Sequence, residues 1–136
     1  MNQTTAIDPA RIKELTAQLP EDPDCIDDDF LEAHGETLSG LKEMFAEKGG
    51  IHLITVDDYS MICRLPTREH FRTAVKKANG DEMLSDKLLL GYVLIYPTMQ
   101  VIERRTDHGA AGLMTSAVRK LAQLSKMSVE ATSKKL

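Results

Sequence analysis

Apolar side chains recur along most of the chain with the three- to four-residue spacing of an amphipathic helix. A short first helix is predicted from Pro9, which follows a capping aspartate, to Leu19, where Pro20 ends the pattern. Further helices are predicted over residues 38–48, 67–78, 81–95, 97–105 and 110–124. The last has a clear apolar stripe, formed by Ala110, Leu113, Met114, Ala117, Val118, Leu121 and Leu124.

The segment from Leu88 to Ile95 is apolar on all sides, a pattern that a buried helix and a buried strand share. The residues before it, 82–87, favour a helix, and Asp81 can cap that helix, so we expect a helix here. The sequence Tyr96-Pro97 then predicts a corner.

Two runs rich in β-branched residues, Ile51–Val56 and Tyr59–Leu65, are separated by the two residues Asp57-Asp58. Such an arrangement predicts a β-hairpin. The predicted fold class is therefore α+β: a mainly helical small domain with one hairpin, in the order helix, hairpin and three to four helices, preceded by an acidic N-terminal extension.

Six acidic residues fall between Pro20 and Asp29. Like charges at this density repel one another, so we expect a linker or an exposed arm. Residues 1–36 would then form a short helix with this acidic arm, and residues 37–136 the α+β domain. A calcium-binding loop starting at Asp22 is not supported, because Ile26, Asp27 and Ala33 stand where a ligand, the turn glycine and the bidentate glutamate are needed.

Composition narrows the class of protein. The chain has 136 residues, the size of one domain, and a formal charge of −4 from 17 Lys and Arg against 21 Asp and Glu. This balance makes nucleic acid a poor default partner. The longest apolar run, Leu88 to Tyr96, is too short to cross a membrane, and no targeting segment is evident. We expect a soluble cytoplasmic protein.

Catalytic and cofactor motifs are missing from the sequence. Four histidines lie at scattered positions without ligand spacing: His34, His52, His70 and His108. Cys63, in the second strand, lacks a marked catalytic partner and reads as a core residue. There is no phosphate-binding or dinucleotide fingerprint. We therefore expect no enzyme, no cofactor and no metal, but a protein that binds another protein.

Two groups of residues are candidates for that binding. Arg64, Arg68 and Arg72 lie at the start of one predicted helix and its approach, and they favour an acidic protein partner, although they leave a nucleic-acid-binding regulator open. Met99, Met114 and Leu121 lie on later helices, where methionine and leucine can form an adaptable groove, although core packing explains them equally well.

Three segments resemble those of bacteriophage tail assembly chaperones over about residues 37–136. The strand-to-helix junction Tyr59–Phe71 contains Arg64-Leu65-Pro66-Thr67-Arg68, similar to the family's Arg-x-Pro-Thr-Arg. The apolar run closing with Tyr96-Pro97 resembles the family's leucine-rich helix and its corner, and the Lys134-Lys135-Leu136 ending is similar to that of some members.

This resemblance implies a non-catalytic protein of the host cytoplasm that binds the tape-measure protein, the tail-tube protein or both during tail morphogenesis. It implies no cofactor. A homo-oligomer is compatible with it. An alternative within the same setting is a structural subunit, such as a head–tail connector or a tail terminator. A frameshifted longer form, encoded at the two terminal lysines, would be a further trait of the family.

Overall fold

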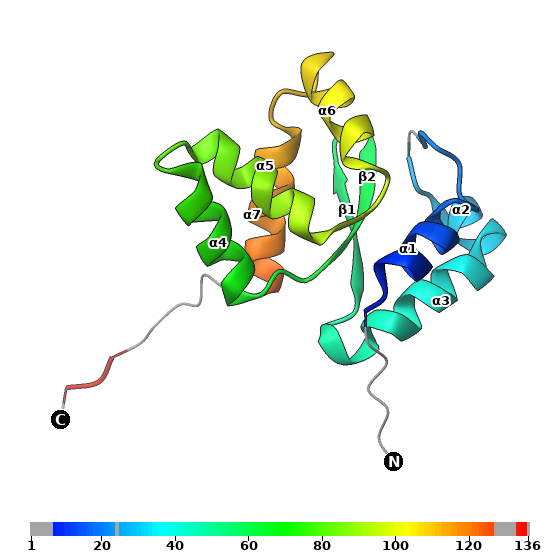
Figure 1. Cartoon of the computed structure of the whole chain (residues 1–136), viewed down its shortest axis with the longest axis horizontal. Helices are drawn as coiled ribbons and strands as arrows, with labels where there is room; N and C mark the ends of the chain where they lie inside the picture. The colour runs from blue at the N-terminus through cyan, green and yellow to red at the C-terminus, as the bar shows by residue number, and fades with distance from the viewer. Residues whose placement is uncertain (1–6, 24, 127–132, 136) are drawn as a thin grey trace.

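The structure is a computed structural model and describes residues 7–23, 25–126 and 133–135. Within these residues it has seven α-helices and one three-stranded antiparallel sheet, which confirms the predicted α+β, mainly helical fold class. The sheet lies at the centre, with α1–α3 on one side of it and α4, α5 and α7 on the other (Figure 1).

The predicted hairpin is confirmed as β1 (Ile51–Val56) and β2 (Tyr59–Arg64). Its two-residue turn uses a positive φ of 53° at Asp57, a conformation that aspartate tolerates better than most residues. The pairing runs from Val56 opposite Tyr59 to Ile51 opposite Arg64. Strand β3 (Leu94–Tyr96) pairs with the other edge of β2, so the strand order is β1-β2-β3.

Strand β3 corrects the prediction of a helix through Ile95. Helix α5 (Glu82–Val93) begins after its cap Asp81, as predicted, but it ends where Leu94 adopts extended backbone. The apolar run is therefore divided between the second half of α5, where Leu89, Leu90 and Val93 are buried, and a short strand that ends before Pro97.

Three helices cover one face of the sheet: α1 (Pro9–Thr16), α2 (Asp28–Ala33) and α3 (Gly35–Phe45), with a 3₁₀ turn (Ala46–Lys48) after α3. They share a hydrophobic cluster with the sheet, whose buried members are Leu15, Leu19, Ile26, Leu38, Leu41, Met44, Phe45, Ile62 and Tyr96. The predicted boundary between residues 36 and 37 thus falls inside α3, and residues from both sides of it pack into one cluster.

The prediction of a linker or exposed arm over Pro20–Asp29 is wrong for its apolar members. Pro23 and Ile26 are buried, and α2 begins at Asp28, within the predicted arm. The described acidic side chains of the segment do remain exposed. Charge repulsion therefore leaves the carboxylates in water without preventing the backbone between them from packing.

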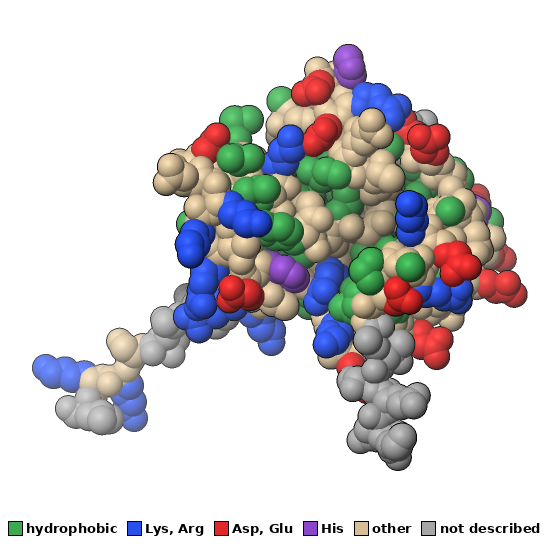
Figure 2. Space-filling model, in the orientation of Figure 1, with side chains coloured by type: hydrophobic (Ala, Val, Ile, Leu, Met, Phe, Trp, Pro, Cys, Tyr) green, Lys and Arg blue, Asp and Glu red, His purple; other side chains and the backbone are tan. Residues whose placement is uncertain are grey.

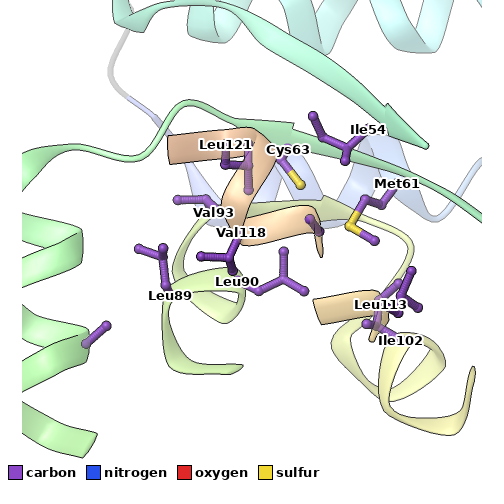
Figure 3. Packing of buried hydrophobic residues seen from close by; sticks show 12 residues of the cluster. Ile54, Met61, Cys63, Leu89, Leu90, Val93, Ile102, Leu113, Val118 and Leu121 are labelled. Atoms are coloured by element: carbon purple, nitrogen blue, oxygen red, sulfur yellow. The ribbon is translucent and has the colours of Figure 1, made fainter. Parts of the chain in front are cut away.

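The other face of the sheet carries the larger cluster. Helix α7 (Leu113–Leu124) packs on β1, α5 packs on α7, and α4 (Arg68–Ala78) packs on α5, with α6 (Met99–Asp107) at one end (Figure 1). Met61 and Cys63 of β2 point toward α7, whereas Ile62 between them belongs to the opposite cluster. Figure 3 shows Val118 and Leu121 of α7 among these residues. The sheet therefore separates two hydrophobic clusters. Successive side chains of β2 point to opposite faces of the sheet, so they enter the two clusters in turn.

Candidate functional site

Two of the exposed large apolar side chains of the described residues, Met83 and Leu84, line a groove between the start of α5 and the ends of α6 and α7 that face it. It has a volume of about 360 Å³. We call it the methionine groove and define it by its lining residues: Asp81, Met83, Leu84, Lys87, Glu103, Thr106, Asp107 and Met114.

Local sequence places the apolar residues of the groove at the surface. Asp81 caps α5 by accepting a hydrogen bond from the Leu84 N–H at 3.1 Å, which fixes the first helical turn. Met83 and Leu84 lie in that turn with exposed fractions of 75% and 38%, among the few large apolar side chains this exposed in the described chain. Hydrophobic side chains protrude there in Figure 2. Apolar area left in water at this position can bind a partner's apolar side chains.

The charges around the methionine groove are mostly negative. Lys87 of α5 and Glu103 of α6 form an ion pair across it, with Nζ and Oε1 3.0 Å apart. Asp81 and Asp107 complete the rim, so three carboxylates face one ammonium group. An apolar segment flanked by Lys or Arg therefore matches the groove better than one flanked by acidic residues.

The structure separates the predicted apolar binding residues. Met114 lines the methionine groove together with Met83 and Leu84. Met99 is half-buried and packs at the edge of the larger core. Leu121 has 0% exposure in the centre of that core, so its assignment to a binding surface is wrong. Its place on the apolar stripe of α7 is explained by packing against the sheet.

The three arginines predicted to bind a partner, Arg64, Arg68 and Arg72, lie at the β2–α4 junction. None of them lines the methionine groove. Arg68 and Arg72 are exposed on α4, where Lys and Arg side chains gather at the left of Figure 2. Arg72 pairs with Glu69 at 3.4 Å in a solvated i,i+3 pair. Arg64 is half-buried, its guanidinium carbon 5.5 Å from the centre of the Phe45 ring, and burial lowers its pKa. Arg64 therefore contributes mainly to packing.

The junction itself is stabilised by a capping box. The Thr67 hydroxyl accepts from the His70 N–H at 3.2 Å, and His70 Nδ1 accepts from the Thr67 N–H at 3.0 Å. The ring nitrogen must be unprotonated to accept. Consistently, the pKa of His70 is lowered, first by burial and then by the charge of Arg64.

Cys63 is unsuited to nucleophilic catalysis. Its side chain is fully buried, and burial raises the pKa of its thiol to about 12. Within residues 7–23, 25–126 and 133–135, no three His, Cys, Asp or Glu side chains converge as a metal site would require. Asp24, which lies between Asp22 and Ile26 in the segment tested as a calcium-binding loop, is outside the described residues.

Sequence reasoning missed the role of Arg105. This residue of α6 is 7% exposed, and its Nη2 lies 2.8 Å from Asp22 Oδ1. It also donates to the Pro23 carbonyl, and its guanidinium carbon lies 4.9 Å from the centre of the Tyr59 ring. Its only local signal in the sequence is the adjacent Arg104, and two adjacent arginines do not identify a partner more than 80 residues away.

A second contact holds the same segment. The Tyr96 hydroxyl donates to the Pro20 carbonyl, and burial raises the pKa of this tyrosine to about 12. Because the contacts from Tyr96 and Arg105 reach residues 20–23 from β3 and α6, they connect the N-terminal helices to the rest of the fold.

Comparison of the chain with models of known protein families, with curated protein sequences and with solved structures finds no match. Among the described helices, none has both the length and the apolar character needed to cross a bilayer.

Proposed function

We propose that the protein is a phage tail assembly chaperone that acts in the host cytoplasm, binding the tape-measure protein, the tail-tube protein or both before tails assemble. It works by binding and without catalysis. The observation that carries the proposal is the methionine groove, where Met83 and Leu84 remain exposed beside Met114. The resemblance at the Arg64–Phe71 junction and the Tyr96-Pro97 corner supplies the identity of the partner.

The groove suits a partner that folds late. Long tape-measure helices carry apolar stripes that aggregate when they are left in water. Methionine side chains adapt to differently shaped residues, so one groove can receive successive positions along such a stripe. Its acidic rim, formed by Asp81, Glu103 and Asp107, favours stripes bordered by Lys or Arg.

Co-expression with the tape-measure protein of the same virus tests the proposal. We expect the chain to co-purify with that protein and to increase its soluble fraction. The double variant Met83→Glu with Leu84→Glu should weaken the complex by about 2 kcal/mol, roughly 30-fold in Kd, because each apolar anchor contributes about 1–2 kcal/mol when buried.

Val75→Glu is the matched control. Val75 is an apolar residue of α4 with 63% exposure, and it does not line the groove. This variant should bind like the unchanged chain. Equal losses in the control and the groove variant would assign the effect to surface charge and would count against the groove.

Two other outcomes favour the alternative functions. Abundant protein in purified virions would indicate a structural subunit, because a chaperone leaves before the particle is complete. Salt-sensitive binding of nucleic acid that is lost on reversing Arg68 and Arg72 would indicate a regulator. Failure of the chain to bind either tail protein would refute the proposal.

A further inference from the structure

The first strand of the sheet leaves one edge open. Strand β1 lies at the end of the order β1-β2-β3, so in the part of the chain that the structure describes it pairs on one side only. Val56 and Tyr59 face each other across the two-residue turn. In a hairpin with such a turn, the pair that flanks the turn is a hydrogen-bonded pair. Alternation along the ladder then directs the N–H and C=O groups of Leu53 and Thr55 away from β2.

This edge lacks the features that usually prevent strand pairing. Strand β1 contains no proline, no glycine, no lysine and no acidic residue over its six positions. Leu53 is 42% exposed, which places it among the few exposed large apolar residues of the described chain. An open, apolar, uncharged edge is a template for another strand.

A trough runs along the same edge, with a volume of about 390 Å³. One wall is β1, from His52 to Val56, and the other is α7, through Ser116, Lys120 and Leu124. An added strand would therefore contact a side wall as well as the backbone of β1, with Leu124 and Leu53 available to its apolar side chains.

The charge of the trough indicates its occupant. Lys120 is exposed and makes no ion pair with any described residue, and no acidic residue lines the trough. His52 Nε2 lies 2.9 Å from the Gly49 carbonyl, so this nitrogen carries the ring proton and adds no negative charge. A carboxylate in the added strand would meet Lys120 with nothing to repel it there.

We propose that the β1 edge binds an extended segment of another protein by strand addition, and that this segment alternates apolar residues around a carboxylate that pairs with Lys120. The site shares no lining residue with the methionine groove. It is independent of the tail-chaperone proposal, because it depends on the backbone of β1 and on Lys120.

Synthetic octapeptides of alternating valine and threonine, with a central glutamate, glutamine or lysine, test the proposal with the full chain. Hydrogen exchange followed by NMR should show that the glutamate peptide protects the outward amides of Leu53 and Thr55. The glutamate peptide should bind about 2–5 times more tightly than the glutamine peptide, the gain typical of an exposed ion pair.

Charge reversal provides the decisive variant. Lys120→Glu should reverse the preference, so that the lysine peptide binds more tightly than the glutamate peptide. The matched control is Arg119→Glu, which changes the adjacent exposed cation of α7 outside the trough and should leave the original preference intact. Both substitutions are on the surface, so both variants should fold.

Three results would overturn the proposal. One is the absence of protection at Leu53 and Thr55 with every peptide. Another is equal affinity for the glutamate and lysine peptides. The third is protection of the same amides that rises with protein concentration and without peptide, since that result would identify a second copy of the chain as the occupant.

Discussion

The contact between Arg105 and Asp22 offers a direct test of how the N-terminal helices are held. The Arg105 side chain is 7% exposed. Among the described residues it forms an ion pair with Asp22, with Nη2 and Oδ1 2.8 Å apart. Substituting Asp22→Ala leaves the guanidinium with the Pro23 carbonyl and the face of the Tyr59 ring. Neither of these groups carries a full negative charge, so the buried cation becomes poorly compensated.

The size of the effect follows from burial. Removing one partner of a fully buried ion pair costs about 3–5 kcal/mol. Asp22 itself is 42% exposed, so water replaces part of its interaction with Arg105. Its second pair, with Arg104 at 3.5 Å, is solvated and contributes at most about 0.5 kcal/mol. We therefore expect the free energy of unfolding to fall by about 2 kcal/mol.

Urea denaturation followed by circular dichroism measures this loss. With a slope of about 2 kcal/mol per molar urea, the midpoint should fall by about 1 M. Glu21→Ala is the control: Glu21 is a neighbouring exposed carboxylate that forms no ion pair with the described residues, and its removal should shift the midpoint little.

A double-mutant cycle isolates the pair. In an Arg105→Met background the buried cation is gone, so Asp22→Ala should cost less than about 0.5 kcal/mol. Equal losses in the two backgrounds would show that Asp22 acts through something other than Arg105. A loss below about 0.5 kcal/mol in the unchanged chain would show that the contact contributes no net stability.

Three further outcomes are expected. Stability should fall as pH drops from about 6.5 toward the lowered folded-state pKa of His70, because the unfolded chain takes up the proton first; urea midpoints of His70→Gln, which can keep the cap, should lack this step. A thiol reagent should label Cys25 in the native protein and Cys63 only after unfolding, since Cys25 is exposed and Cys63 is buried; labelling of both at one rate would contradict the structure. As pH rises from about 10 to the folded-state pKa of Tyr96, about 12, the Tyr96 hydroxyl loses its proton first in the unfolded chain, so the free energy of unfolding should fall. Urea midpoints of Tyr96→Phe should fall less over the same pH range.

Much of the fold could be predicted because local chemistry determines it. The starts of α1, α4 and α5 were predicted from capping aspartate or threonine residues and, for α1, from Pro9. The hairpin was predicted from the β-branched residues on both sides of Asp57-Asp58. Strand β3 could not be predicted in the same way. An all-round apolar run has no period, so only pairing with Ile62 and Cys63 of β2 shows that Leu94–Tyr96 is extended.

The packing of the acidic segment, residues 20–29, could not be predicted from the sequence for a different reason. Its composition is dominated by carboxylates, which do stay in water, whereas its position is determined by Pro23, Ile26 and the distant residues Tyr96 and Arg105. Contacts that join residues about 80 positions apart leave no periodic signal in a sequence. The charge pattern therefore predicts where the side chains lie but cannot predict where the backbone packs.

Helix α7 shows why predicted core residues and predicted binding residues were confused. Its apolar stripe is clear in the sequence, and the centre of that stripe, at Ala117 and Leu121, is fully buried. The residues of α7 that line the two candidate sites lie off that centre: Met114 in the methionine groove, and Ser116, Lys120 and Leu124 in the trough beside β1. A helix that packs on a sheet uses the middle of its stripe for stability, because the most apolar positions gain most from burial. Binding surfaces of this protein should therefore be sought at the borders of such stripes, where an apolar or charged side chain is held rigidly but is still reached by water.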